Sequence, residues 1–179
     1  MRIVSGDFKG RTIPVRKDFP SRPTTDFAKE NIFNVLHNHF DFEEIEVLDL
    51  FSGTGSISFE FASRGAIKVT SVELNYQSFD FIRTTAKNLE MQNLFAVKAD
   101  AFRFIEKCTE TYDIVFADPP YDLKALDMLP EKVFQKGLLK PEGWFILEHG
   151  KRNNFNSHPK IFEMRNYGSV CFSIFRQTE

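Results

Sequence analysis

Four consecutive residues in this chain have the chemistry to hold a planar amine. Asp118-Pro119-Pro120-Tyr121 follows an apolar run at 112–117 that predicts a buried strand. The prolines hold φ at about −65° and lack an N–H, so the loop is rigid and its carbonyl oxygens are less easily engaged locally. These oxygens and the Asp118 carboxylate are acceptors suited to an exocyclic NH2 group, and Tyr121 could stack on its ring. Because Asp-Pro pairs often begin turns, the alternative is a plain strand-ending turn.

A glycine loop follows the first strand that the apolar pattern predicts. Its sequence is Asp49-Leu50-Phe51-Ser52-Gly53-Thr54-Gly55, in which Gly53 and Gly55 allow a tight turn and close approach of a ligand to the backbone. Ser56 begins the next predicted helix, whose N-terminus favours a carboxylate or a phosphate. Taken alone, this loop is weak evidence for a site, since ordinary turns also use glycine.

Acidic residues end the following predicted strands in chain order. Glu73 lies about 20 residues beyond the glycine loop, where a carboxylate can accept from both ribose hydroxyls. Asp100, beside Ala101, could accept from an adenine amine, and Asp118 ends the fourth strand. Because ligands of doubly wound sheets bind beyond the carboxyl ends of the strands, this series predicts a site for an adenosine cofactor.

Two adenosine cofactors fit these residues, NAD and S-adenosylmethionine. The dinucleotide fingerprint calls for a third glycine at position 58, where this chain has Ser58. Asp49 and Asp100 flank the turn, and acidic neighbours suit a sulfonium and an ammonium better than a pyrophosphate. Asp49 either meets that ammonium through water or supports the glycine loop from inside. The sequence therefore favours S-adenosylmethionine, with a NAD-dependent oxidoreductase as the alternative.

The elements that must position these residues alternate between strand and helix. Short apolar runs predict strands at 47–50, 68–72, 94–98, 114–117 and 144–149. The segments between them predict helices at 57–63, 78–89, 102–107 and 126–135. A final hairpin is predicted from 161–164 and 170–175 around Asn166-Tyr167-Gly168. This βαβ order predicts an α/β fold with a doubly wound, mostly parallel sheet.

The N-terminal residues 1–40 depart from this alternation. Residues 1–15 predict a small hairpin with basic side chains on its surface, namely Lys9, Arg11 and Arg16. Thr25 or Asp26 would cap the following helix. We expect that helix to expose Lys29 and Glu30. Its apolar side chains are expected in the core: Phe27, Ile32, Phe33, Val35 and Leu36.

Size and charge set further bounds. The chain has 179 residues, enough for one domain with a full core. Its net charge is −2, but residues 1–30 and 150–179 each carry +3 and the middle carries −8, so a polyanion would prefer the two ends. Cys108 and Cys171 have no metal or redox spacing, and no apolar run approaches a membrane span or a signal-peptide core. We expect a reduced, cytoplasmic protein that binds neither a metal nor a membrane.

Together, the glycine loop and Asp118-Pro119-Pro120-Tyr121 resemble class I S-adenosylmethionine-dependent amino-methyltransferases. Further segments resemble the RsmD-type 16S ribosomal RNA guanine-N2 methyltransferases: 2–6, 9–11, 22–26, 32–36, 148–149 and 167–168. One departure is Phe27-Ala28-Lys29-Glu30 in the N-terminal helix, where family members often carry an arginine. The four-residue motif is specific to amino methylation, whereas the choice of guanine depends on the resemblance.

The resemblance implies a fold, a reaction and a set of site residues. The fold is a Rossmann-like, seven-stranded sheet with an antiparallel last strand; residues 1–40 form an RNA-contacting hairpin and helix, and 41–179 form the methyltransferase domain. The reaction transfers a methyl group from S-adenosylmethionine to a guanine N2 in 16S rRNA or the small ribosomal subunit. Separately from the resemblance, we expect a monomer. The implied residues are, for catalysis, Asp118, Pro119, Pro120 and Tyr121; for the cofactor, Asp49, Phe51, Ser52, Gly53, Gly55, Glu73, Asp100 and Ala101; for RNA, Arg2, Lys9, Arg11, Arg22 and Thr24.

Two other functions stay open. The four-residue motif also permits N6 methylation of adenine in RNA or DNA, although the chain has no separate target-recognition domain. The second open function is a non-catalytic RNA-binding module that has kept the fold. The intact Gly53 and Asp118 argue against this function.

Overall fold

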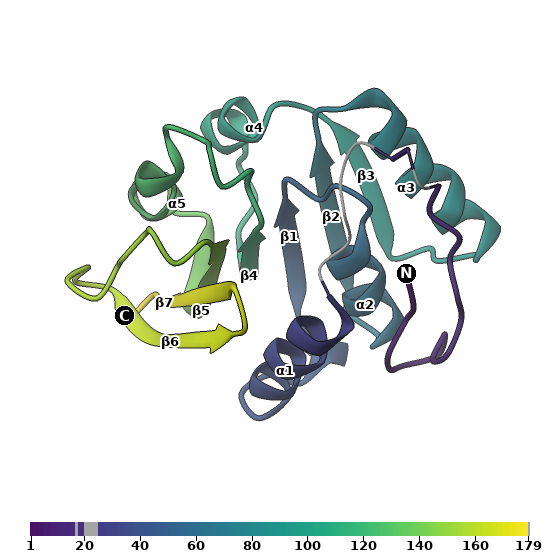
Figure 1. The fold of residues 1–179 in the computed structure, drawn as a ribbon, viewed down its shortest axis with the longest axis horizontal. Helices are drawn as coiled ribbons and strands as arrows, with labels where there is room; N and C mark the ends of the chain where they lie inside the picture. Colours follow the sequence, from purple (N-terminus) through teal and green to yellow (C-terminus); the bar gives the residue numbers. More distant parts are fainter. Residues whose placement is uncertain (17, 20–24, 179) are drawn as a thin grey trace.

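The centre of the protein is one seven-stranded sheet in the order β3-β2-β1-β4-β5-β7-β6 (Figure 1). The structure is a computed structural model that describes residues 1–16, 18–19 and 25–178. The strands are β1 Glu46–Leu50, β2 Lys68–Glu73, β3 Leu94–Lys98, β4 Tyr112–Ala117, β5 Leu139–His149, β6 Ile161–Tyr167 and β7 Val170–Arg176. β1 to β5 run parallel, and β7 is antiparallel to both β5 and β6. The predicted Rossmann-like sheet with an antiparallel last strand is confirmed.

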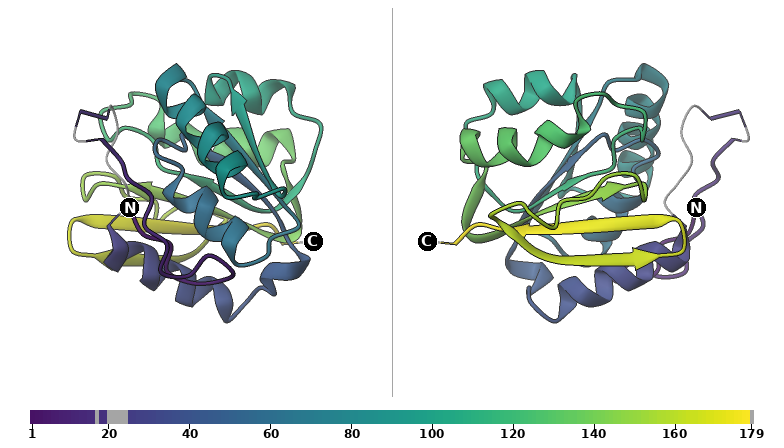
Figure 2. Two further views of the ribbon diagram at one scale, coloured as in Figure 1. Left: turned by 90° about the vertical axis from the view of Figure 1, so that its right-hand side faces the viewer. Right: turned by 60° about the vertical axis from the view of Figure 1, so that its left-hand side comes forward.

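Helices cover both faces of this sheet (Figure 2). They are α1 Asp26–His37, η1 Phe42–Glu44, α2 Ser56–Ser63, α3 Tyr76–Asn88, α4 Ala101–Lys107, η2 Leu126–Met128 and α5 Leu129–Lys136. The core shared with α1, α2 and α3 contains Val47 and Ile114, whereas the core shared with α4 and α5 contains Leu48 and Val115. Because successive strand residues point to opposite faces, each continuous apolar strand contributes to two cores.

β5 begins at Leu139, five residues before the predicted start at Trp144. Pro141 and Gly143 concealed this extension, since both residues are uncommon inside strands. The ladder to β4 shifts register between Tyr112 and Ile114, which accommodates the irregular segment.

Residues 1–13 form a closed loop rather than the regular hairpin that was predicted. One antiparallel bridge joins Arg2 to Thr12. Gly6 at the tip has a φ of 81°, and a Cβ there would lie 1.8 Å from the carbonyl oxygen of Ser63 at the end of α2. The loop therefore packs closely against α2. Its basic side chains are exposed as expected: Lys9 and Arg11.

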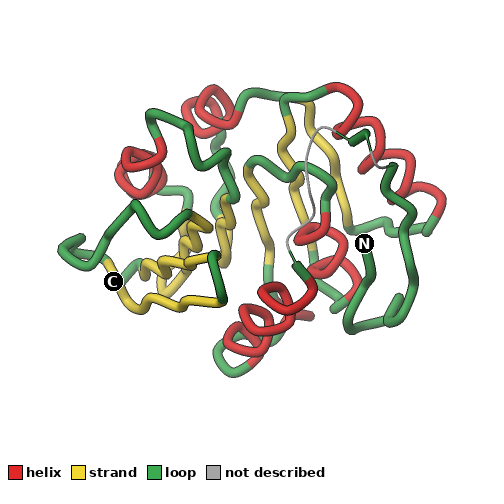
Figure 3. Tube along the Cα trace, in the orientation of Figure 1, coloured by secondary structure: helices red, strands yellow, loops and turns green. Residues whose placement is uncertain are grey.

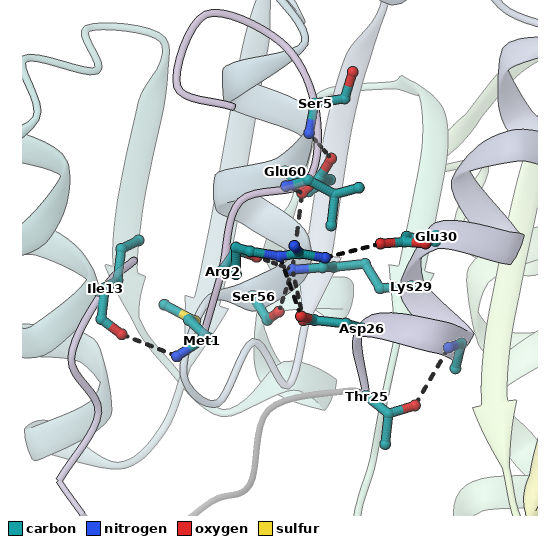
Figure 4. Close-up of polar contacts among 12 residues, drawn as sticks. Met1, Arg2, Ser5, Ile13, Thr25, Asp26, Lys29, Glu30, Ser56 and Glu60 are labelled. Atoms are coloured by element: carbon teal, nitrogen blue, oxygen red, sulfur yellow. Dashed lines mark hydrogen bonds and ion pairs between the residues drawn. The ribbon is translucent and has the colours of Figure 1, made fainter. Parts of the chain in front are cut away.

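The prediction for the first turns of α1, with Lys29 exposed and Phe27 in the core, was wrong. Lys29 is 1% exposed and Phe27 is 65% exposed. Lys29 Nζ donates to the carbonyl oxygen of Arg2 at 2.6 Å and to Ser56 Oγ at 3.2 Å (Figure 4). It also lies 3.8 Å from Glu60 Oε2. Burial lowers the pKa of Lys29, and the charge of Glu60 opposes that change. The lysine lies inward because α2 presents a buried carboxylate, and this orientation of the helix leaves Phe27 at the surface.

Candidate active site at the carboxyl edge of the sheet

The glycine loop links β1 to α2 through three residues with positive φ. These angles are 60° at Phe51, 54° at Gly53 and 76° at Gly55. The Gly55 N–H donates to the carbonyl oxygen of Ser52 at 2.7 Å. A Cβ at Gly55 would lie 2.8 Å from Ile82 Cγ1 of α3, so glycine is needed for α2 to begin this close to α3. The loops after β1, β2 and β3 lie at the same end of the sheet (Figure 3).

Asp49 is buried beneath this loop. Its Oδ2 accepts a hydrogen bond from Ser58 Oγ at 2.5 Å. Burial raises the pKa of Asp49 to about 7, and hydrogen bonds from Ser58 and Ser52 oppose that rise. The serine at position 58, where a dinucleotide site would have glycine, therefore supports the Asp49 carboxylate from the first turns of α2.

Glu73 ties the end of β2 to the glycine loop. Its Oε2 accepts the Gly53 N–H at 2.8 Å, and its Oε1 accepts the Asn75 N–H at 2.7 Å. Each oxygen retains a second lone pair, which can accept from a ribose hydroxyl. Leu74, which sequence reasoning missed, is 61% exposed directly beyond this carboxylate. An apolar residue between Glu73 and Asn75, just past the strand, was the available signal.

Asp100 has a structural role that the prediction did not include. It is the N-cap of α4, and its Oδ1 accepts the Arg103 N–H at 3.0 Å. Its other oxygen is the one that an adenine amine would meet. Ala101 is buried in the core under α4, and the neighbouring Phe102 meets Phe51 edge to face with ring centroids 6.1 Å apart.

The loop after β4 lies directly beside the glycine loop. β4 pairs with β1, and the Asp118 N–H donates to the carbonyl oxygen of Leu50 at 3.4 Å. Pro119 is buried, whereas Pro120 is exposed and its carbonyl oxygen accepts the Leu123 N–H at 2.9 Å. The fold thus places the predicted amine site next to the predicted cofactor site.

The Tyr121 ring is held at two points although it is 50% exposed. Its hydroxyl donates to Glu148 Oε1 at 3.2 Å. A Cβ at Gly150 would lie 3.3 Å from Tyr121 Cδ2, so the ring packs on glycine backbone. Tyr121 is therefore a fixed flat wall with access to solvent.

Three carboxylates lie together at this edge of the sheet. Burial raises the pKa of Asp118 well above its ordinary value, and the charges of Glu148 and Asp49 raise it further. Burial, Glu148 and Asp118 likewise raise the pKa of Tyr121. A cationic ligand bound here would lower these pKa values and favour the ionised carboxylates. Sequence reasoning noted Glu148 only as part of a family-like segment. An acid near the carboxyl end of a buried strand was the available signal, and it resembles the one that identified Asp118.

Only some of the residues expected to contact RNA lie together on one surface. Arg2 and Lys9 line one groove of about 660 Å³ beside α1. Arg11 is exposed on the same N-terminal loop but lies outside that lining. Arg22 and Thr24 fall outside the described residues.

The described ranges lack both a metal-binding cluster and a membrane-spanning helix. No group of three His, Cys, Asp or Glu side chains there could hold a metal ion. The helices of those ranges are also too short or too polar to cross a membrane.

A family model described as Conserved hypothetical protein 95 matches residues 1–176. The chain belongs to this family. Ribosomal RNA small subunit methyltransferase D of Escherichia coli (strain K12) is 26% identical over 180 residues, which cover 99% of this chain and 90% of that relative. The Haemophilus influenzae protein of the same name is 30% identical over 155 residues, covering 84% and 79%. A solved Escherichia coli structure described as "Putative methyltransferase yhhF" has a TM-score of 0.86 at 26% identity, covering 99% of this chain and 98% of that one. The resemblance to RsmD-type methyltransferases is confirmed.

Proposed function

We propose that this family member transfers a methyl group from S-adenosylmethionine to the exocyclic N2 amine of a guanine in small-subunit ribosomal RNA. One observation carries the proposal: the glycine loop and the Asp118 loop lie side by side, joined by the hydrogen bond from Asp118 N–H to Leu50 at 3.4 Å. A methyl donor held by the first loop would face an amine held by the second. The names of the Escherichia coli and Haemophilus influenzae relatives support ribosomal RNA as the substrate.

The residues at the ends of β1 and β2 fit S-adenosylmethionine, which supplies an electrophilic methyl group when bound. Each Glu73 oxygen accepts one backbone N–H and keeps a lone pair for a ribose hydroxyl. Leu74 offers an exposed apolar surface next to that position for the adenine ring. The pKa values of Asp49 and Asp118 are raised in the free protein, so a ligand that carries a sulfonium and an ammonium would be stabilised by their ionised forms and would favour those forms.

The Asp118 loop would make the guanine amine a better nucleophile. An aromatic amine is a weak nucleophile because its lone pair is delocalised into the ring. Hydrogen bonds from N2–H to the Asp118 carboxylate and the Pro119 carbonyl would localise that lone pair and orient it. Asp118 stabilises the positive charge that develops on the nitrogen as it accepts the methyl group, and the proton then passes to Asp118 or to water. Tyr121 would stack on the target base, which must leave its helix to reach the site.

Product analysis tests the reaction and the base together. Small ribosomal subunits and naked 16S rRNA from a strain that lacks this protein would be incubated with labelled S-adenosylmethionine, and the modified nucleoside would be identified. We expect N2-methylguanosine. N6-methyladenosine would contradict the choice of guanine, and the absence of transfer to both substrates would contradict the proposal as a whole.

The role of Asp118 has its own test. Asp118→Ala should abolish methyl transfer and leave the Kd for S-adenosylmethionine, measured by calorimetry, within a few-fold of wild type. Asp122→Ala is the matched control, because Asp122 is an exposed carboxylate in the same loop. Full activity of Asp118→Ala would refute the mechanism, and binding of NAD in place of S-adenosylmethionine would refute the cofactor.

A further inference from the structure

An exposed aromatic ring lies at the start of α1 and has no role in the mechanism above. Phe27 is the most exposed large apolar side chain in the described part of the protein. Its ring meets that of Tyr167 edge to face, with centroids 6.1 Å apart and planes at 89°. Tyr167 in turn packs against the core beneath α1. The Phe27 ring is thus supported from one side and open to solvent on another.

The first turn of α1, which carries this ring, lies next to the cofactor half of the candidate site. Lys29, two residues along α1, donates to Ser56 Oγ at 3.2 Å. Ser56 directly follows Gly55, the last residue of the glycine loop. The first turn of α1 is therefore beside the head of α2.

The ring also lies at the end of the sheet that carries the half of the site that would hold the base. Tyr167 ends β6, and the turn from β6 to β7 reaches Cys171, which pairs with His149 at the carboxyl end of β5. The next residue, Gly150, is the one on which the Tyr121 ring packs. Both views in Figure 2 show the β6–β7 turn beside the start of α1. Tyr167, and with it Phe27, thus lies at the same end of the sheet as the two catalytic loops, toward the β6 edge.

The spacing suits a nucleotide next to the target. The ends of β4 and β6 are separated by three strand spacings, which amounts to about 14 Å at roughly 4.8 Å per spacing. Extrusion of the target base removes the stacking partner of its neighbour, and an exposed aromatic ring can replace that partner for any base. Arg2 adds an exposed guanidinium near the ring, since its Nε lies 3.5 Å from Asp26, the residue before Phe27. A guanidinium there can contact the phosphate of the stacked nucleotide.

We propose that Phe27, supported by Tyr167, stacks on a base of the RNA strand next to the target nucleotide. This inference rests on the proposed function, because it takes the substrate to be RNA whose target base enters at Tyr121. The occupant is a nucleobase rather than a protein side chain because the ring lies at the same end of the sheet as the two catalytic loops, within the reach of an RNA strand that enters them.

Fluorescence of a modified RNA tests the contact directly. A 16S rRNA fragment would carry 2-aminopurine beside the mapped target guanine, and its fluorescence and Kd would be measured with wild type, Phe27→Ala and Phe27→Trp. We expect quenching with wild type and with Phe27→Trp, and both loss of quenching and a Kd raised about 10-fold with Phe27→Ala. The affinity for S-adenosylmethionine and the slope of log Kd against log salt should not change, because neither depends on stacking.

Phe95→Ala is the matched control, since Phe95 is 50% exposed on β3 at the opposite edge of the sheet. It should leave the Kd for RNA unchanged. Equal Kd values for Phe27→Ala and wild type, or an equal loss with Phe95→Ala, would overturn the proposal. So would a Phe27→Ala defect on assembled subunits but not on the naked fragment, because the ring would then contact a ribosomal protein. If wild type methylates RNA, these results refute only the stacking; if it transfers no methyl group, the proposed function fails as well.

Discussion

Replacing Glu60 should destabilise this protein far more than replacing its buried partner Lys29. Glu60 is fully buried on α2, and its carboxylate accepts the N–H groups of Val4 at 2.9 Å and Ser5 at 3.0 Å. Arg64 lies 2.8 Å from the same carboxylate, and Lys29 lies 3.8 Å from it. Figure 4 shows Glu60 between the N-terminal loop and α1. One side chain thus joins three segments.

The magnitude follows from the partners that each substitution leaves behind. Glu60→Leu removes one member of a buried ion pair, which typically costs about 3–5 kcal/mol. It also leaves two backbone N–H groups without acceptors, at about 1–3 kcal/mol each before relaxation. We therefore expect a loss of about 5 kcal/mol. Lys29→Met keeps the other partners of Glu60 and relieves the burial of an ammonium, so its expected cost is about 1–2 kcal/mol.

Urea unfolding measures this difference. With a slope of about 2 kcal/mol per molar urea, the midpoints of the two variants should lie about 1.5–2 M apart. Glu110→Ala, which breaks the exposed pair between Lys68 and Glu110, should shift the midpoint by less than about 0.5 M. Similar midpoints for Glu60→Leu and Lys29→Met would refute the assignment of Glu60 as the joining residue. Limited proteolysis should also cleave residues 1–13 sooner in Glu60→Leu.

Three further predictions concern the site. Gly55→Ala should lower the free energy of unfolding by about 2–4 kcal/mol, because the new Cβ would lie 2.8 Å from Ile82. Gly137→Ala is the control: Gly137 also has a positive φ, 69°, but no atom lies within 4 Å of a Cβ there, so we expect a loss of about 1 kcal/mol. Thermal unfolding measures both changes. Tyr121→Phe should lower kcat only a few-fold, since it keeps the ring and loses the bond to Glu148, whereas Tyr121→Ala should lower kcat/KM by about 10–100-fold in a methyl-transfer assay. The pKa of Asp49 is about 7 in the folded protein, against an ordinary value of 3.8. The contribution of its protonation to the stability of the fold is therefore complete below about pH 4 and is lost as the pH rises through 7. Because a cationic cofactor favours the ionised form, its affinity in calorimetry should rise between about pH 6 and 8 with release of protons, and an affinity independent of pH would contradict this reasoning.

Most of the sheet and most of the candidate site residues could be predicted from short segments. Apolar runs located six of the seven strands closely and β5 in part, and the residues that end strands located Gly53, Glu73 and Asp118. These signals are local, because strand periodicity and strand-end chemistry are written within a few residues. Parallel order then places the strand ends at one edge without further information.

Other features depended on residues far apart in the chain. Lys29 is buried and Phe27 is exposed because Glu60, thirty-one residues after Lys29, lies under α1. Glu148 comes next to Tyr121 and Asp118 only because β5 pairs with β4. No local pattern in α1 distinguishes a lysine that meets a buried carboxylate from one that meets water.

The sequence by itself therefore determined the order of strands and helices, and it predicted a cofactor loop and a motif for an amine. The tertiary structure decided which carboxylates share the site, which face of α1 is inward and how the N-terminal loop is held. The physical reason is that hydrophobic periodicity specifies that a face will be buried, whereas the partner it meets, and hence its charge and pKa, depends on segments brought together only by the fold.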